Sequence, residues 1–222
     1  MRETVRVHVQ PRSASSRAID LELTWTPTER PVRLLGADGK SYGGLTLRFG
    51  PRSKTIITVP GGRTSGDLVV THLPWADLSG DLKKGGEDLS GIAVFVDPGH
   101  PDFPPTWMTR HYGLLAVGWP GVTPKTLAAG KPVTCRYRIW IHRGTPDAAE
   151  IQRAYAEYCA TVRQCNRSIH QRFRQLLTNG EELDEAAHGQ NLPDRRCRAA
   201  QEEPALAGLG ELGEVKQSTK PR

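Results

Sequence analysis

The chain has 222 residues, of which 37% are hydrophobic and 6% aromatic, and its formal net charge is +6. This length suits one domain with an appendage, or two small domains. No apolar run reaches about 18 residues, so no membrane-spanning helix and no membrane partner are expected. The first residues lack the apolar core of a secretory signal, so we expect a cytoplasmic protein.

Alternating apolar and polar residues recur along the chain as far as His142, and this period of two is typical of half-buried strands. The segments with strand character, in chain order, are 5–9, 19–25, 45–49, 55–59, 67–73, 91–96, 113–119 and 132–142. Segments 91–96 and 113–119 are apolar throughout, so both of their faces should be buried.

The segment 132–142 has the clearest alternation. Its inward face is predicted to carry the apolar residues Val133, Cys135, Tyr137, Ile139 and Ile141. The opposite face carries Thr134, Arg136, Arg138, Trp140 and His142. This second face suits a solvated surface under the C-terminal helix somewhat better than a concave binding surface.

Turns rich in Gly and Pro separate these segments, and strands do not alternate with helices. The sequence therefore predicts an all-β fold, an antiparallel β-sandwich. One helix should close it, since Thr145 is a good N-cap and Pro146 suits the first helical position. We expect the sandwich and helix to occupy residues 1–165. Residues 166–222 should be weakly helical at first and then a disordered tail, because few bulky apolar residues follow about 178.

The scattered basic charge contains no long block of like residues, so nucleic acid is not an expected partner. The four cysteines, Cys135, Cys159, Cys165 and Cys197, form no C-x-x-C pair. They indicate neither zinc nor a disulfide, and no metal site is predicted. The sequence identifies no cofactor and no oligomeric state.

Residues 97–112 concentrate the side chains that could form a site. We expect His111, Asp97 and His100 to be the acid–base groups, with His111 as the proton carrier. A ligand would be held by aromatic stacking and polar contacts from Trp107, Arg110, Tyr112, Asp102, Trp75 and Asp77. The alternative is a proline-stiffened loop that caps the sandwich, with Trp107 filling the core.

Residues 91–121 read GIAVFVDPGHPDFPPTWMTRHYGLLAVGWPG. This segment resembles the PmoA-like family, labelled "methane oxygenase PmoA", whose members carry a stretch of the kind G-I-A-x-F-D-H-P-x-N-P-x-x-P-x-x-W-H-x-R-x-Y-G-L. The upstream 75–80 (WADLSG), the strand 137–144 (YRIWIHRG) and the helical 154–158 (AYAEY) look like further elements of the family. The chain departs from the pattern at Val96-Asp97, His100 and Met108.

The resemblance implies a β-sandwich similar to galactose mutarotases, and hence a protein that binds or processes a carbohydrate. A membrane methane monooxygenase subunit is not expected, because such a subunit needs transmembrane helices. The alternative function is a non-catalytic β-sandwich interaction module. Whether the chain is an enzyme is left open by the sequence.

Overall fold

The computed structural model describes residues 1–36, 43–50, 52–82 and 88–178, with side chains through residue 164. The tail expected to be disordered, beyond residue 178, lies outside the described residues. In chain order the elements are β1 (Arg2–Val9), β2 (Ser16–Thr26), β3 (Val32–Leu34), β4 (Thr46–Arg48), β5 (Ser53–Val59), β6 (Gly62–Arg63), β7 (Val69–His72), β8 (Trp75–Asp81), β9 (Ser90–Val96), β10 (Thr106–Arg110), β11 (Leu114–Gly118), β12 (Lys125–Leu127), β13 (Val133–Arg143) and α1 (Ala148–Thr178).

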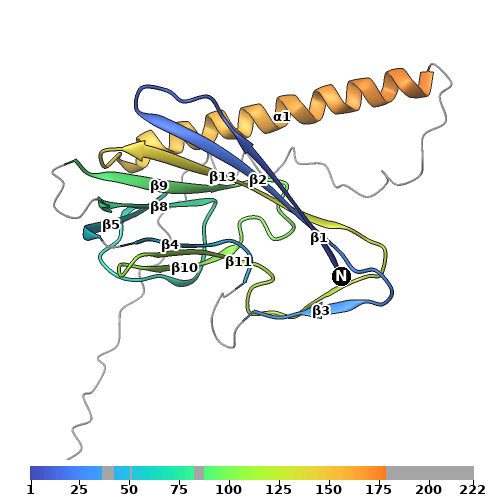
Figure 1. Ribbon diagram of the computed structural model, residues 1–222, viewed down its shortest axis with the longest axis horizontal. Helices are drawn as coiled ribbons and strands as arrows, with labels where there is room; N and C mark the ends of the chain where they lie inside the picture. Colours follow the sequence, from blue (N-terminus) through green and yellow to red (C-terminus); the bar gives the residue numbers. More distant parts are fainter. Residues whose placement is uncertain (37–42, 51, 83–87, 179–222) are drawn as a thin grey trace, which may run out of the picture.

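The elements form three layers, with α1 on the outside of a large sheet and a smaller sheet on its other side (Figure 1). The large sheet has seven strands in the order β1-β2-β13-β9-β8-β5-β6, and every pairing within it is antiparallel. The smaller sheet has four strands in the order β4-β11-β10-β7, and β12 pairs with β3 apart from both. The predicted all-β antiparallel sandwich with one C-terminal helix is confirmed.

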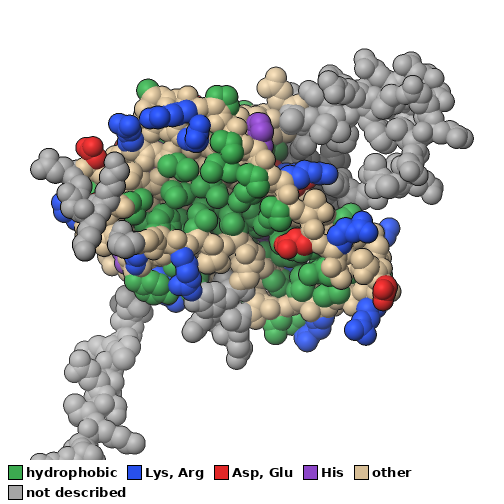
Figure 2. Space-filling view, viewed as in Figure 1, with side chains coloured by type: hydrophobic (Ala, Val, Ile, Leu, Met, Phe, Trp, Pro, Cys, Tyr) green, Lys and Arg blue, Asp and Glu red, His purple; other side chains and the backbone are tan. Residues whose placement is uncertain are grey.

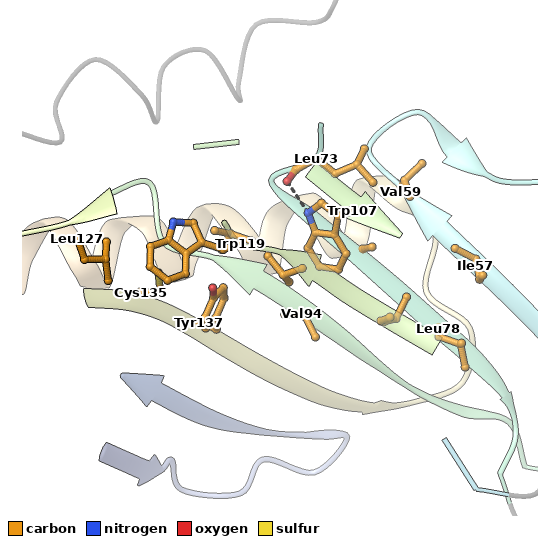
Figure 3. Close-up of a cluster of buried hydrophobic side chains, with 14 residues drawn as sticks. Ile57, Val59, Leu73, Leu78, Val94, Trp107, Trp119, Leu127, Cys135 and Tyr137 are labelled. Atoms are coloured by element: carbon orange, nitrogen blue, oxygen red, sulfur yellow. Dashed lines mark hydrogen bonds between the residues drawn. The ribbon is translucent and has the colours of Figure 1, made fainter. Parts of the chain in front are cut away.

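The main core lies between the seven-stranded and four-stranded sheets (Figure 3). β8 and β9 contribute Leu78 and Val94 from the large sheet, and β10 contributes Trp107 from the small one. Where β12 and β3 meet the sandwich, the rings of Trp25 and Trp119 stack with their centroids 5.0 Å apart. The alternating strand pattern delivers these side chains, because every second residue faces the opposite sheet.

The outer face of the large sheet is covered by α1. Phe95 of β9 contacts Tyr155 and Tyr158 of the helix, with ring centroids 5.6 Å and 6.1 Å apart. The Tyr155 hydroxyl donates to the Val96 carbonyl at 3.2 Å, and Trp75 Nε1 donates to Gln152 at 2.8 Å. The helix therefore packs through an apolar stripe that also satisfies its buried polar groups.

The inward face predicted for 132–142 is confirmed for Cys135 and Tyr137, which lie in the main core. The solvated character expected of the opposite face is wrong at Arg138, whose side chain is 15% exposed. Its guanidinium makes two hydrogen bonds with Asp20, at 2.6 and 2.9 Å, and lies 4.8 Å from the centroid of the Tyr158 ring. The helix buries this face, and Asp20 on β2 supplies the countercharge.

One further feature differs from the sequence-based expectations. The segment 97–112 is not a single loop, because it contains the strand β10, which pairs with β11 and β7. α1 runs without interruption to Thr178, so its last part is the stretch after residue 165 that was expected to be weakly helical. No described helix is both long and apolar enough to cross a membrane.

Candidate functional site

The acidic end of the predicted loop is a buried turn that follows β9. Asp97 Oδ1 accepts the Gly99 backbone N–H at 2.6 Å, whereas Oδ2 is buried with no hydrogen-bond partner. Burial therefore raises the pKa of Asp97 above its ordinary value of 3.8. Such a carboxyl group suits a proton donor or acceptor, but it is 3% exposed and does not face solvent.

His100 is also buried, at 1% exposure. Its Nδ1 accepts the Asp102 backbone N–H at 3.1 Å, so a neutral ring carries its proton on Nε2, which lies 3.2 Å from the Tyr137 hydroxyl. The Asp102 side chain pairs with Lys125 at 2.6 Å. These contacts hold the turn against the core. The surroundings of His100 are therefore those of a residue that stabilises the turn.

Both tryptophans that were expected to contact a ligand are 0% exposed. Trp107 lies in the main core and its Nε1 donates to the Leu73 carbonyl at 2.8 Å. Trp75 lies beneath α1. Neither ring presents a face to a ligand, because protein atoms cover both. The position of Trp107 agrees with the alternative interpretation, in which its side chain fills the core.

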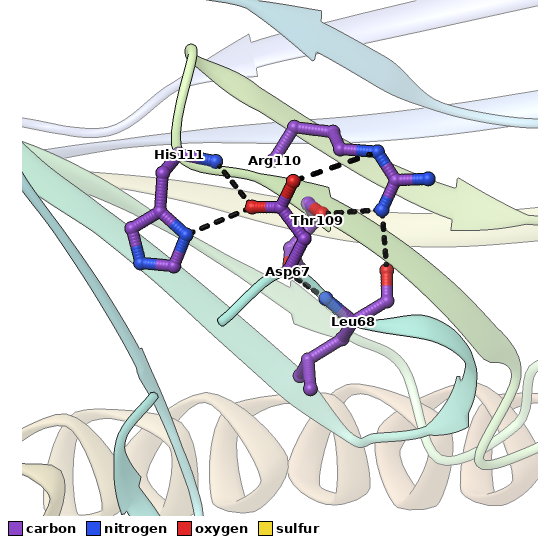
Figure 4. A network of polar contacts seen from close by, with 5 residues as sticks. All are labelled: Asp67, Leu68, Thr109, Arg110 and His111. Atoms are coloured by element: carbon purple, nitrogen blue, oxygen red, sulfur yellow. Dashed lines mark hydrogen bonds and ion pairs between the residues drawn. The ribbon is translucent and has the colours of Figure 1, made fainter. Parts of the chain in front are cut away.

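The remaining predicted residues of the loop gather at the far end of β10 (Figure 4). The backbone N–H of His111 donates to Asp67 Oδ1 at 2.7 Å, and the ring Nδ1 lies 2.8 Å from the same oxygen. Arg110 hydrogen-bonds the Leu68 and Thr109 carbonyls and lies 3.8 Å from Asp67 Oδ2. Tyr112 is 55% exposed. β10 therefore separates His111 from Asp97 and His100, so the three expected acid–base groups do not share one site.

Asp67 is a partner of His111 that sequence reasoning missed. Burial opposes the shift, but the hydrogen bonds from His111 and the charge of Arg110 lower the pKa of Asp67. Asp67 fixes the orientation of the His111 ring, whose side chain is 33% exposed. No local spacing points to this pair, because 44 residues separate its members and only the pairing of β7 with β10 brings their segments together.

A second carboxylate–imidazole pair joins β8 to β13 of the large sheet across the strand between them, β9. Asp77 of β8 is 0% exposed, its Oδ1 lies 2.8 Å from Nε2 of His142, and its Oδ2 accepts the Ser79 hydroxyl at 2.7 Å. Gly91 makes room for the cluster, since a Cβ there would lie 2.5 Å from Ser79 Oγ and 2.7 Å from His142 Cε1. The three polar side chains therefore satisfy one another in a space that only glycine leaves open.

His142 also lines a cavity of about 620 Å³ at one end of the large sheet, where β2 and β9 begin and β13 ends. The connection from β1 to β2 is held over it by a hydrogen bond of 3.1 Å from the Arg143 N–H to the Ser15 carbonyl. Three exposed arginines line the cavity, Arg12, Arg17 and Arg143.

The cavity is positively charged. Its lining residues include three arginines and one carboxylate, that of Asp88. None of the three guanidinium groups forms an ion pair with a described residue. Ser15, Ser16 and Ser90 add hydroxyl groups to the wall. This composition suits a small anion that also carries hydroxyl groups.

A family model matches residues 1–156, which is most of the chain. The chain belongs to DUF6807, a family of unknown function. No curated protein and no solved structure is significantly similar to it. The matched region of this DUF6807 chain includes the whole cavity and both carboxylate–imidazole pairs.

The described part of the DUF6807 chain contains no group of three or more His, Cys, Asp or Glu side chains arranged to hold a metal ion. Sequence reasoning missed the cavity because its arginines come from two distant parts of the chain, Arg12 and Arg17 around the start of β2 and Arg143 at the end of β13. Sequence reasoning did name Asp77 as a ligand-binding residue and placed His142 on the second face of segment 132–142, but it did not predict that the two side chains pair.

Proposed function

We propose that this DUF6807 chain binds a small acidic carbohydrate, one that carries a carboxylate or phosphate, in the cavity lined by Arg12, Arg17 and Arg143. The observation that carries the proposal is that three arginines line one cavity and that none of them forms an ion pair with a described residue. Arginine binds carboxylate and phosphate through two parallel hydrogen bonds, so anions of this shape are the ligands it favours.

The size and walls of the cavity support a carbohydrate. Its volume of about 620 Å³ lies within the range of pockets that hold small molecules, roughly 300–1,000 Å³. The hydroxyls of Ser15, Ser16 and Ser90 can exchange hydrogen bonds with sugar hydroxyls, since each both donates and accepts. Leu89 and Ile141 add an apolar part of the wall against which the carbons of a sugar ring can lie.

His142 is the residue of the cavity wall that could carry a proton. It is the lining residue whose imidazole is held by a buried carboxylate, through the 2.8 Å contact with Asp77. Its Nδ1 lies 3.4 Å from the Arg143 carbonyl and the residue is 4% exposed, so proton transfer with a bound hydroxyl group requires that this second contact opens. The proposal is therefore a binding site with one candidate proton carrier, His142, in its wall.

Calorimetric titration with glucuronate, glucose 6-phosphate and glucose tests the proposal. The acidic sugars should bind and glucose should bind more weakly, because only the acidic sugars engage the guanidinium groups. A hydrogen bond to a charged group is worth about 1.5–3 kcal/mol, so Arg143→Ala should weaken binding roughly 10–100-fold. Arg12→Ala should act in the same direction.

Arg33→Ala is the matched control, since Arg33 is an exposed arginine on β3 outside the cavity. It should leave binding unchanged. Equal affinity for glucose and glucuronate, or unaltered binding by Arg143→Ala, would contradict the proposal.

The second candidate function is a non-catalytic interaction module. The observation that favours it is the long open edge of the large sheet formed by β1, which lies outside the cavity.

A further inference from the structure

β1 is the one long, regular edge among the sheets of the described residues. It spans 8 residues, pairs with β2 in an unbroken register and ends the strand order of the large sheet. The opposite edge of that sheet, β6, has 2 residues. The edges of the four-stranded sheet, β4 and β7, have 3 and 4 residues. Short edges resist pairing with other chains, whereas a long regular edge offers unpaired backbone N–H and C=O groups.

The inner face of β1 is apolar and uncovered. Val5, Val7 and Val9 are 52%, 59% and 50% exposed. Along one row of the sheet, Val9 pairs with the half-buried Ile19, and Ile19 pairs with Ile139. Figure 2 shows hydrophobic side chains gathered on this side of the molecule, where β2 and β13 lie in Figure 1. The large sheet therefore extends beyond the small sheet that covers its centre.

The outer face of β1 is basic. Arg2, Arg6 and His8 alternate with the valines, and the side chain of Arg6 is 75% exposed although it pairs with Glu22. Glu22 also pairs with Arg136, so two guanidinium groups share one carboxylate beside this edge. The one acidic residue of β1, Glu3, points to the same face as the valines, and its carboxylate accepts a hydrogen bond from Trp25 Nε1.

These charges disfavour a second copy of the chain as the partner strand. Antiparallel self-pairing centred on Arg6 sets Val5 opposite Val7, but it also sets Arg6 opposite Arg6. Centring on Val7 sets Arg6 opposite His8, and centring on Val5 sets Arg2 opposite His8. The register centred on Arg6 sets like charges directly opposite each other, which destabilises a strand pair, and the other two registers set an arginine opposite an imidazole without an acidic partner. A strand with acidic residues at these positions removes the conflict.

We propose that β1 is a docking edge for an extended segment of a partner protein in which acidic residues alternate with apolar ones. The segment adds to the large sheet beside β1, and its backbone pairs with the open N–H and C=O groups. Its apolar side chains lie beside Val5, Val7 and Val9, and its acidic side chains lie beside Arg2, Arg6 and His8. This edge is separate from the arginine-lined cavity, so the inference does not depend on the proposed ligand.

A pair of fluorescent octapeptides tests the proposal with the full chain. In one probe valine alternates with glutamate, and in the other valine alternates with lysine. The glutamate probe should bind in a fluorescence anisotropy titration, and the lysine probe should bind roughly tenfold more weakly or not at all. Binding should slow hydrogen exchange at the backbone amides of β1, which pairs on one side only.

Arg6→Glu reverses the charge of a basic side chain, 75% exposed, that the proposal uses. It should shift the preference toward the lysine probe, while Arg33→Glu should retain the preference of the parent. Val7→Lys should weaken binding of both probes, and Val122→Lys, at another exposed valine (40%), should not. Thermal unfolding confirms that each variant is folded.

Three results would overturn the proposal. They are equal binding of both probes to the parent, an unchanged preference in Arg6→Glu, and protection that falls outside β1. Sedimentation of the parent alone provides the check on the occupant. Self-association that protects β1 would show a second copy in place of an acidic segment.

Discussion

At the scale of single residues, the cluster of Asp77, His142 and Ser79 is a buried polar feature closely packed against Gly91. All three side chains are buried, and the two carboxylate oxygens of Asp77 each meet one partner. Buried polar groups of this kind are nearly neutral to stability when satisfied and costly when one partner is removed. The same cluster positions the imidazole that lines the cavity.

Asp77→Ala should therefore destabilise the protein by about 3 kcal/mol, because it leaves His142 and Ser79 buried without their shared acceptor. Urea unfolding followed by tryptophan fluorescence measures the change as a lower midpoint with an unchanged slope. Asp88→Ala, at the exposed carboxylate of the cavity, should stay within about 0.5 kcal/mol of the parent. Comparable losses for the two variants would show that the Asp77 cluster is not important for stability.

At the scale of elements, β2 forms ion pairs of different burial with its two neighbours, β13 through Arg138 and β1 through Arg6. Asp20 and Arg138 have side chains 29% and 15% exposed, whereas Arg6, which pairs with Glu22, is 75% exposed. Burial by itself raises the pKa of Asp20, but the hydrogen bonds from Arg138 and Gln10 and the charge of Arg138 lower it below its ordinary value of 3.8. The contribution of the Asp20–Arg138 pair to the free energy of unfolding should therefore depend on pH.

Arg138→Ala should cost about 1–3 kcal/mol at neutral pH, because Asp20 loses both hydrogen bonds and the Tyr158 ring loses its cation. A lowered folded-state pKa gives stability that is present above pH 3.8 and is lost as pH falls through the folded-state value. The difference between parent and variant should therefore shrink below pH 3.8. Arg6→Ala should cost less than about 1 kcal/mol, as exposed pairs do. A pH-independent difference for Arg138→Ala would contradict this account.

Strand periodicity predicted which side of 132–142 faces the core, because a period of two depends only on neighbouring residues. It did not predict that the other side is buried, since the partner of Arg138 is Asp20, 118 residues away. The predicted site residues lie apart in the fold for a related reason. Residues close in sequence, such as Asp97 and His111, are separated by β10, and the residues that do meet, Asp67 with His111 and Asp77 with His142, come from different strands.

At the scale of the whole molecule, the seven-stranded sheet is wider than the four-stranded sheet that it packs against. The core therefore draws on β5, β8, β9 and β13 from the large sheet, with β2 packed at its margin, while no residue of β1 belongs to any buried cluster. An all-β fold could be predicted from the spacing of strands and turns. The unequal widths could not, because they depend on how strands pair over long separations.

If β1 is an interaction edge and not part of the core, its removal should leave the sandwich folded. Deletion of residues 1–9 should lower the free energy of unfolding by roughly 2–4 kcal/mol, from lost ladder hydrogen bonds with β2. Unfolding should remain cooperative, and hydrogen exchange should still show protected amides in β9 and β13, which pair with each other through Tyr137 and Val96. The half-buried Ile19, Leu21 and Leu23 of β2 would become more exposed, so a rise in dye binding to apolar surface should accompany the deletion.

Substituting Val5 and Val7 by threonine in the full chain is the matched control, because it removes apolar surface without removing the strand, and it should cost less than about 1 kcal/mol at these exposed positions. Loss of protection in β9 and β13 on deletion would show instead that β1 is required for the core.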